Sequence, residues 1–510
     1  MWDVSRRWRV QQALAEFQRN KHTGRLLSGL SLYWRSPLFQ SNWKKKKRAG
    51  YVTLLQTFFN DPDLYTQLSP TNFFFSSPST THPLFSILPF TPSLTMPFWK
   101  RLGPGNGPTS PISESYSLQT QMPARASIAT KIRLSMAATA WIDALGAPLE
   151  FQKRSSFPFV TTMLPNENFH LPPGVWTDDT SMMLCLAYSI STYEAISTGF
   201  DEVNQLEQYQ RWHEEGFLSA VDKCFDIGTT VKSALDIYKR YSSNPEEALH
   251  RIRSDLGGEN CSGNGSLMRL LPIGLAYWRD ESQARHYARR SSQTTHPSNM
   301  CLETCEMWAS AISRIMEASA LESTEFDPPV PFSKLSLLEF VSNFPYSNTR
   351  LRQALTLPFG SPPRPQSRVD LEQYYFKYHP LLRLIPDTQN SAGSPRDNKF
   401  PYFIPSEDLI PSSGFILHTV VAALYCFFTT RTFEEGALMA INLGDDADTV
   451  GSIYAGLAAC WYAAEETKSD RLFWTKRVKE WRKNIVKPEL IEDITEKLIL
   501  LEQRMASEFM

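Results

Sequence analysis

Apolar residues recur at helical spacing over most of the chain after residue 125. Residues 128–141 and 302–316 place apolar and small side chains every three or four positions, which predicts amphipathic helices. Residues 415–428 and 449–460 are apolar almost throughout, which predicts helices buried on most sides. No stretch shows the alternation of a strand, and no internal repeat is evident. The pattern therefore predicts an all-α fold.

The first 125 residues lack this periodicity. Residues 1–51 are basic and include a Lys/Arg run at 44–48, and residues 69–123 are rich in Pro, Ser, Thr and Phe. Such a composition does not build a packed core, so we expect a mostly disordered extension with a few short helices. The basic run could direct nuclear import or bind phosphate, and the first residues could form an organelle transit peptide. A start at Met96 or Met122 would remove most of this segment.

The change of pattern near residue 125 divides the chain into two regions. We expect a helical domain over residues 126–510, preceded by the extension of residues 1–125. Within the domain, residues 325–411 are rich in Pro, Ser and Asn. That composition indicates an insertion or a lid over the helical body.

Charge and composition narrow the classes of function. The chain of 510 residues has a formal net charge of −1, which suggests neither a nucleic-acid nor a membrane partner. It contains no uninterrupted apolar run of about 18 residues and no signal-peptide pattern. Its seven cysteines are odd in number and lie mostly in apolar segments, which is typical of reduced thiols. We expect a soluble, monomeric, cytoplasmic or nuclear protein, with organelle targeting left open.

A cluster of acids precedes one of the buried helices. Asp445, Asp446, Asp448 and Thr449 stand directly before a run of small and apolar residues. Carboxylates at the edge of a core repel one another and lose hydration, so such a cluster indicates a bound cation. Oxygen ligands without nearby Cys or His suit Mg²⁺, Mn²⁺ or Ca²⁺ better than Zn²⁺. The alternative is capping of the helix, for which one Asp and one Thr would suffice.

A second segment has the same design. Thr177, Asp178, Asp179 and Thr180 precede a helical pattern with Met182 on its apolar face. Two buried helices that each begin with paired Asp could face each other across a dinuclear metal site. Such a site would activate a water molecule and hold an oxygen-rich substrate.

Other segments carry weaker signals. Glu150 follows Pro148, which predicts a helix end just before this glutamate, and an acid there is typical of a surface. Asp226 precedes a Gly and two Thr, as a helix cap does. The glycine-rich turn at 263–269 could bind an anion such as phosphate, although it lacks the ending of a P-loop. His296 precedes a Pro, which is typical of a turn.

Taken together, these segments resemble the ADP-ribosylglycohydrolase family, which includes the bacterial dinitrogenase reductase-activating glycohydrolases. The matching motifs come in family order: DALGAPLE at 143–150, WTDDT at 176–180, DIGTT at 226–230, GNGSLMR at 263–269 with Pro272, TH at 295–296 and NLGDDADT at 442–449. The resemblance covers about residues 126–465, interrupted by the Pro-rich segment.

The resemblance implies a compact all-α fold with two Mg²⁺ or Mn²⁺ ions in a central cleft. The metal ligands that it implies are Thr177, Asp178, Asp179, Asp446, Asp448 and Thr449. It implies catalytic roles for Glu150 and Asp226, and a supporting place for Asp445 beside the ligands. Binding of the diphosphate and ribose of ADP-ribose is implied for Gly263, Asn264, Gly265, Ser266 and His296.

One departure from the family pattern concerns the first motif. Ile142 stands where the family usually has Gly, in a zone that also contains Ala137, Ala138 and Ala140. The added bulk could displace this helix and carry Glu150 away from the metals.

The sequence therefore predicts a metal-dependent hydrolase that cleaves the bond between ADP-ribose and an acceptor. The acceptor could be an Arg or Ser side chain, a polymer link or a small molecule. One alternative is a non-catalytic ADP-ribose or nucleotide-binding protein on the same scaffold, and the place of Glu150 separates the two. A Mg²⁺-dependent isoprenoid diphosphate enzyme is the other, but such enzymes need an acid four residues after Asp178, where this chain has Met182.

Overall fold

The described part of the chain is helical. The computed structural model describes residues 117–122, 126–192, 199–321, 332–383, 404–467 and 470–508. Within these ranges there are helices and isolated bridges but no extended strand. The all-α prediction is therefore confirmed. The prediction of disorder for residues 1–125 falls almost entirely outside the described residues.

Most of the helices begin at a capping Ser, Thr, Asp or Asn such as Ser127 or Asp201. Their bounds are α5 (Ile128–Gly146), the 3-10 turn η3 (Ala147–Leu149), α6 (Asp178–Ser191), α8 (Glu202–Glu215), α9 (Thr229–Arg240), α10 (Pro245–Asp255), the 3-10 turn η4 (Glu259–Cys261), α11 (Leu271–Ala276), α12 (Glu281–Gln293), α13 (Asn299–Leu321), α14 (Lys334–Asn343), α15 (Thr349–Leu355), α16 (Arg368–Tyr378), α18 (Ile416–Thr429), α19 (Phe433–Ile441), α20 (Ala447–Tyr462), α21 (Lys476–Asn484) and α22 (Pro488–Glu508).

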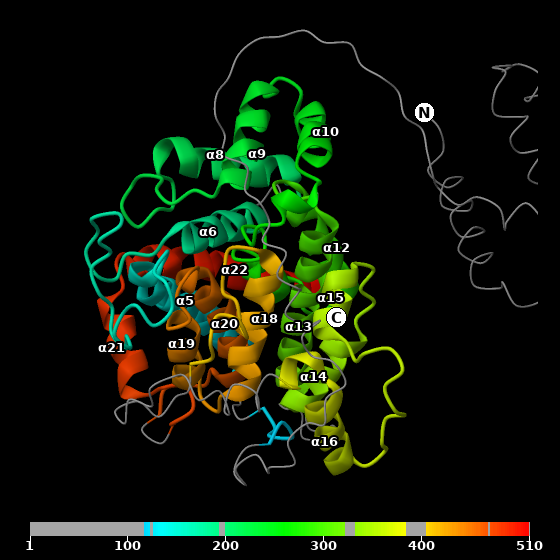
Figure 1. Cartoon of the computed structure of the whole chain (residues 1–510). Helices are drawn as coiled ribbons and strands as arrows, with labels where there is room; N and C mark the ends of the chain where they lie inside the picture. The colour runs from blue at the N-terminus through cyan, green and yellow to red at the C-terminus, as the bar shows by residue number, and fades with distance from the viewer. Residues whose placement is uncertain are drawn as a thin grey trace, which may run out of the picture. The chain divides into compact units, whose positions relative to one another are not determined.

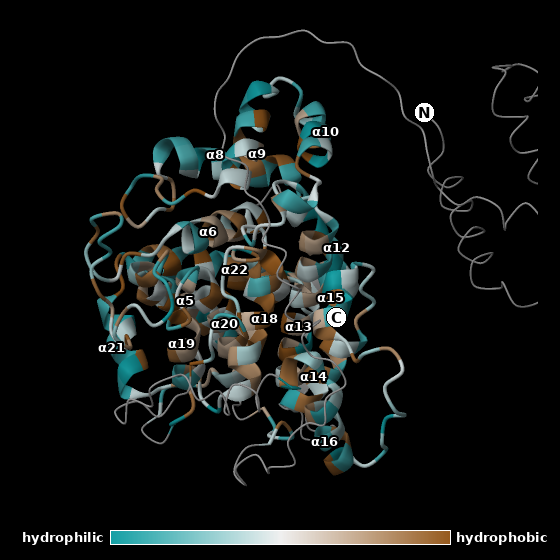
Figure 2. Cartoon of the chain, in the orientation of Figure 1, coloured by the Kyte–Doolittle hydropathy of each residue, from teal (hydrophilic) through white to brown (hydrophobic). Residues whose placement is uncertain are grey.

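Helix α20 lies at the centre of the core. Every one of its residues is buried, and it packs against α5, α13, α18 and α19 (Figure 1). In Figure 2, α18 beside it is brown, whereas the outer helices α10 and α21 are largely teal. Burial on all sides agrees with the apolar pattern that predicted this helix. The start of α20 carries the acidic cluster into this core.

The bulk of Ile142 is accommodated where α5 crosses α20. A Cβ atom on Gly451 would lie 2.9 Å from Cγ2 of Ile142 and 3.0 Å from Cγ2 of Ile441. The missing side chain at Gly451 therefore leaves room for the side chain of Ile142. The two helices therefore stay closely packed at this crossing.

The end of α5 is fixed by its contact with the start of α20. The helix ends at Gly146, and Pro148 lies in the 3-10 turn that follows, so Glu150 comes directly after the turn, as predicted. A Cβ atom on Gly146 would lie 2.7 Å from Cα of Asp448 and 2.8 Å from the carbonyl oxygen of Ala447. Only glycine allows this approach of two backbones.

Gly146→Ala is expected to destabilise the protein by about 1–3 kcal/mol, because the new methyl group meets backbone atoms that cannot turn away. It should also weaken metal binding, since relief of the clash moves Asp448. Chemical denaturation with and without Mg²⁺ measures both effects. Unchanged stability together with an unchanged Mg²⁺ response would show that the two helix ends are not held at this distance.

The segment predicted as an insertion contributes to the core in its described part. Helix α14 packs against α13, and α15 against α18. Leu335, Leu338 and Leu351 are fully buried. Residues 117–122 are packed as well, because Leu118 is fully buried and its N–H donates to the Glu372 carboxylate of α16 at 2.5 Å. The division at residue 125 and the insertion itself stay predictions.

Two further expectations can be compared with the described residues. All seven cysteines are free thiols. Among the described helices, none combines the length and the apolar character that a bilayer span requires.

Candidate active site

A small acidic cavity of about 280 Å³ lies where the starts of α6, α9 and α20 come together with the turn after α5. Its lining residues are Glu150, Phe151, Asp178, Asp226, Gly228, Thr229, Thr230, Val231, Gly263, Asn264, Gly265, Met268, His296, Gly414, Asp445, Asp446, Asp448 and Thr449. No Lys or Arg of the described residues is among them. The cavity therefore collects most of the residues that the sequence singled out.

Two groups of carboxylates at this cavity could each hold a metal ion. Oxygens of Asp143, Asp179 and Asp448 lie within 4.8 Å of one another, and so do oxygens of Glu150, Asp226 and Asp448. Asp448 belongs to both groups, so the two groups adjoin. Because all the ligand atoms are carboxylate oxygens, a hard divalent cation fits them better than a softer metal.

Unpaired oxygens at the same place also favour a cation. Oδ2 of Asp179 and Oε2 of Glu150 are buried and accept no hydrogen bond. A buried carboxylate oxygen without a partner is costly unless a proton or a metal ion compensates it. The residues present therefore fit a pair of divalent ions.

Asp143 holds the start of α6 against the end of α5. Its carboxylate accepts hydrogen bonds from the backbone N–H of Thr177 at 3.0 Å and of Thr180 at 3.0 Å. It also accepts from the hydroxyls of Thr177 at 2.9 Å and Thr180 at 2.5 Å. The sequence analysis did not single out Asp143, although an Asp within an otherwise apolar helix was a usable signal.

The loop before α20 is fixed from behind by Arg154. This buried guanidinium donates to the Leu443 carbonyl at 2.6 Å and to the Ser412 hydroxyl at 2.8 Å. The N–H of Asp446 donates to the Ser412 carbonyl at 3.0 Å. On the cavity side, Nδ2 of Asn264 donates to Oδ2 of Asp446 at 2.6 Å. The loop is thereby held without a ligand.

The capping alternative fails for two of the acids. Asp446 occupies the cap position of α20 but makes no capping bond with its side chain. The cap residue of α9 is Gly228, and Asp226 lies before it with a left-handed φ of 55°. Thr177, by contrast, does cap α6, accepting from the N–H of Asp179 at 3.4 Å.

Burial and mutual repulsion raise the pKa values of the cluster. Burial raises the pKa of Asp143 to about 6, against the opposing effect of its hydrogen bonds. Burial, followed by the other carboxylates, raises the pKa of Asp178, Asp179 and Asp448 well above the usual range. Burial also raises the pKa of Asp446, despite its hydrogen bonds. A cation would stabilise these groups in their ionised form.

Glu150 and Asp226 form a pair. Burial, then the charges of Asp448 and Asp226, raises the pKa of Glu150 far above that of a free glutamate. Burial raises the pKa of Asp226 to about 6, and a side-chain hydrogen bond between the two acids lowers it. Without a bound cation, these shifts favour the protonated form of Glu150. Such a pair can hold a proton at the cavity.

His296 lies against the glycine-rich turn. Its Nδ1 is 2.8 Å from the Thr295 hydroxyl, which accepts from the Arg269 guanidinium at 2.8 Å. Nε2 of His296, the other ring nitrogen, lies beside Gly263 and Gly265. Burial and the charge of Arg269 lower the pKa of His296 to about 3. The imidazole is thus neutral.

Not all of the predicted residues line the cavity. Thr177 and Asp179 are buried and do not line it. Ser266 is also buried, with its hydroxyl 2.9 Å from that of Ser292. The glycine-rich turn does not lead directly into a helix, because α11 begins only at Leu271. Phe151 and Gly414 line the cavity but carried no signal that we recognised in the sequence.

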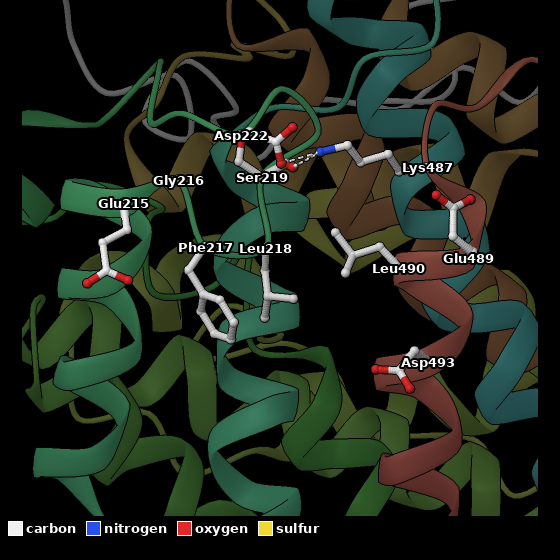
Figure 3. A pocket seen from close by; sticks show the side chains of 10 residues that line it. All are labelled: Glu215, Gly216, Phe217, Leu218, Ser219, Asp222, Lys487, Glu489, Leu490 and Asp493. Carbon is white, nitrogen blue, oxygen red and sulfur yellow. Dashed lines mark hydrogen bonds and ion pairs between the residues drawn. The ribbon is translucent and has the colours of Figure 1, made fainter.

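A larger cavity, of about 540 Å³, lies elsewhere, between the end of α8 and the start of α22. Figure 3 shows Lys487 reaching across it to Asp222, at 2.6 Å, and to the Ser219 carbonyl, at 3.2 Å. None of the predicted site residues lines this cavity. Its single lysine is already paired, so size alone does not make it the functional site.

The protein is all-helical, and its helix ends bring two groups of carboxylates together. These two features place it among candidate metal-binding proteins. Residues 124–508 match the ADP-ribosylglycohydrolase family, and the chain belongs to this family. It is 27% identical over 368 residues to an ADP-ribosylarginine hydrolase of Serratia proteamaculans, covering 70% of this chain and 76% of that protein.

Two further similarities were found. An ADP-ribosyl-dinitrogen reductase glycohydrolase of Rhodospirillum rubrum is 22% identical over 332 residues, which cover 64% of this chain and 84% of that protein. A solved structure titled "ADP-ribosylglycohydrolase-related protein complex" is 26% identical and has a TM-score of 0.47, with 74% of this chain and 99% of that chain covered. The family model over residues 124–508 confirms the predicted family.

Proposed function

We propose that this protein is a metal-dependent hydrolase that cleaves the glycosidic bond between ADP-ribose and an acceptor. The observation that carries the proposal is the position of Glu150, whose carboxylate lies within 4.8 Å of those of Asp226 and Asp448. Membership of the family and the hydrolase names of its relatives support the same reaction. A non-catalytic binding protein would not require the acid pair of Glu150 and Asp226 beside the proposed metal ligands.

The metal ions would be held by Asp178, Asp179, Asp446 and Asp448, with the hydroxyls of Thr177 and Thr449. Their proximity supports this assignment, since the Thr449 hydroxyl donates to Oδ1 of Asp179 at 3.3 Å. Bound Mg²⁺ or Mn²⁺ would supply Lewis acidity and orient the ribose hydroxyls.

The remaining roles belong to side chains that face the cavity. Glu150, paired with Asp226, would transfer the proton that moves from the attacking water to the departing acceptor. The surrounding carboxylates would stabilise positive charge as it develops at C1″ of the ribose. The neutral His296, next to Gly263 and Gly265, would donate from Nε2 to an oxygen of ADP-ribose, and Asn264 would keep Asp446 in place. Ser266, which does not line the cavity, would support binding by holding the glycine-rich turn through its hydrogen bond with Ser292.

The first test is release of ADP-ribose from mono-ADP-ribosylated Arg and Ser peptides by the full chain. We expect release with Mg²⁺ or Mn²⁺ and none with EDTA. Comparison of the two peptides also identifies the acceptor. A thermal shift with ADP-ribose but no release from either peptide would contradict the hydrolase proposal and favour the binding protein.

A further inference from the structure

The loop between α15 and α16 is rich in exposed proline. Residues 357–365 read LPFGSPPRP, and Pro358, Pro362 and Pro363 are exposed. Figure 1 shows this loop, in yellow, standing out from the helices on its way to α16. It belongs to the segment that the sequence predicts as an insertion, and none of its residues lines the acidic cavity. The proposed reaction therefore does not account for its composition.

Proline restricts the second half of the loop to an extended backbone. The rings of Pro362, Pro363 and Pro365 fix φ at about −65°, and a residue that precedes a proline avoids the helical region. Together these two effects act on all of residues 361–365, which form neither helix nor strand. A chain restricted in this way favours the polyproline II conformation. The loop thus presents a short segment prepared for that conformation, with two prolines spaced as Pro-x-x-Pro.

Contacts with neighbouring helices hold this segment in place. The Tyr374 hydroxyl of α16 donates to the Pro362 carbonyl at 2.7 Å. The Arg364 guanidinium donates to Oδ1 of Asn343 in α14 at 2.5 Å. A segment that is already ordered loses less conformational entropy on binding than a flexible one. The exposed proline rings are therefore preorganised for contact with another molecule.

Phe359 is fully exposed next to these prolines. Its relative exposure is 108%, so the rest of the described chain does not cover it. It shares a turn with Gly360, which has φ 82° and no other heavy atom within 4 Å of the place that a Cβ would take. Prolines alone could serve to stiffen the loop, but stiffening needs no exposed aromatic ring. An aromatic side chain at the tip of an ordered loop is instead placed to enter a pocket of a partner.

The conformation of the segment identifies the kind of partner. Polyproline II segments are bound in grooves lined by aromatic side chains, such as those of SH3 and WW domains, and binding costs little entropy because the segment is already extended. We propose that residues 358–365 are a docking segment for a protein domain with an aromatic-lined proline groove, and that Phe359 fills an apolar pocket beside this groove. The interaction is separate from hydrolysis at the acidic cavity.

Binding of the full chain to a panel of purified SH3 and WW domains, measured by biolayer interferometry, tests the docking segment. We expect at least one domain to bind, and we expect Pro362→Ala and Phe359→Ala each to weaken that binding at least about tenfold. A decaproline peptide should compete with the full chain for the same domain. Leu500→Ala and Pro488→Ala, which change exposed residues of α22, are the matched controls and should bind as the unaltered protein does.

Binding by neither class of domain would overturn the proposal. So would binding that both loop variants leave unchanged, because the contact would then lie elsewhere on the chain. Far-UV circular dichroism and thermal melts of the variants separate lost contact from lost folding. If a variant does melt at a lower temperature, the decaproline competition decides, since it needs no variant, and a failure to compete would overturn the proposal. Release of ADP-ribose should be unchanged in Pro362→Ala and Phe359→Ala, because neither residue lines the acidic cavity.

Discussion

Replacing Asp446 and Asp448 together by Asn is expected to abolish ADP-ribose release and the thermal stabilisation by Mg²⁺. Activity should fall at least about a thousandfold, because Asp448 belongs to both carboxylate groups and Asp446 is a further proposed ligand. At a Mg²⁺ concentration about 100 times its Kd, the unaltered protein should gain about 2.7 kcal/mol of stability, and the variant none. Enzyme assays and thermal melts with and without Mg²⁺ measure these effects.

The same variant should be more stable than the unaltered protein in EDTA. Burial and neighbouring carboxylates raise the pKa of Asp448, so the folded protein without metal holds protons that the unfolded chain has lost. Such a group stabilises the fold fully below the unfolded pKa of about 4, and this stability is lost as pH rises through the folded pKa. Asp143 and Asp226 have folded pKa values of about 6. They therefore also lower the stability of the metal-free protein as pH rises from about 4 to 6.

Melts in EDTA over this pH range should therefore show a smaller fall in stability with rising pH for the double variant. Asp236→Asn, on the exposed face of α9, controls for the loss of a carboxylate as such. The far-UV circular dichroism should be unchanged in both variants. A double variant that still responds to Mg²⁺ would sink the assignment of the metal site.

The sequence was sufficient to locate the acids because each signal is local. Thr177 to Asp179 and Asp446 to Asp448 stand at helix starts, where a surplus of charge over the need for capping is visible in a few residues. The end of α5 before Glu150 was also predictable, because proline acts on its own neighbourhood. The all-α class followed in the same way from periodicity.

Features that depend on tertiary packing could not be predicted. The approach of Asp143 to Asp179 and Asp448 requires knowing that α5 crosses α20 with Gly146 against its start. The left-handed backbones of Phe151 and Asp445 are imposed by hydrogen bonds between segments nearly 300 residues apart, and neither residue type predicts such a conformation. Helices α14 to α16 were obscured by the many prolines around them.

Glu150→Gln is the change that separates catalysis from binding. We expect kcat to fall about 10²–10⁴-fold, because the amide cannot take up or release the proton that the Glu150–Asp226 pair manages. The amide oxygen keeps the shape of the side chain, and the proposed metal ligands at the starts of α6 and α20 are untouched. Thermal stabilisation by Mg²⁺ and by ADP-ribose should therefore remain close to that of the unaltered protein.

Glu317→Gln, at an exposed position of α13, is the matched control and should leave kcat unchanged. Loss of Mg²⁺ stabilisation in Glu150→Gln would mean that this glutamate serves the metals rather than the proton. Full activity would remove Glu150 from the reaction and leave Asp226 as the acid to test next. Because Glu150 follows a turn that Pro148 and the Gly146 contact hold against α20, a catalytic role for it would also explain why two buried helices approach so closely at this end.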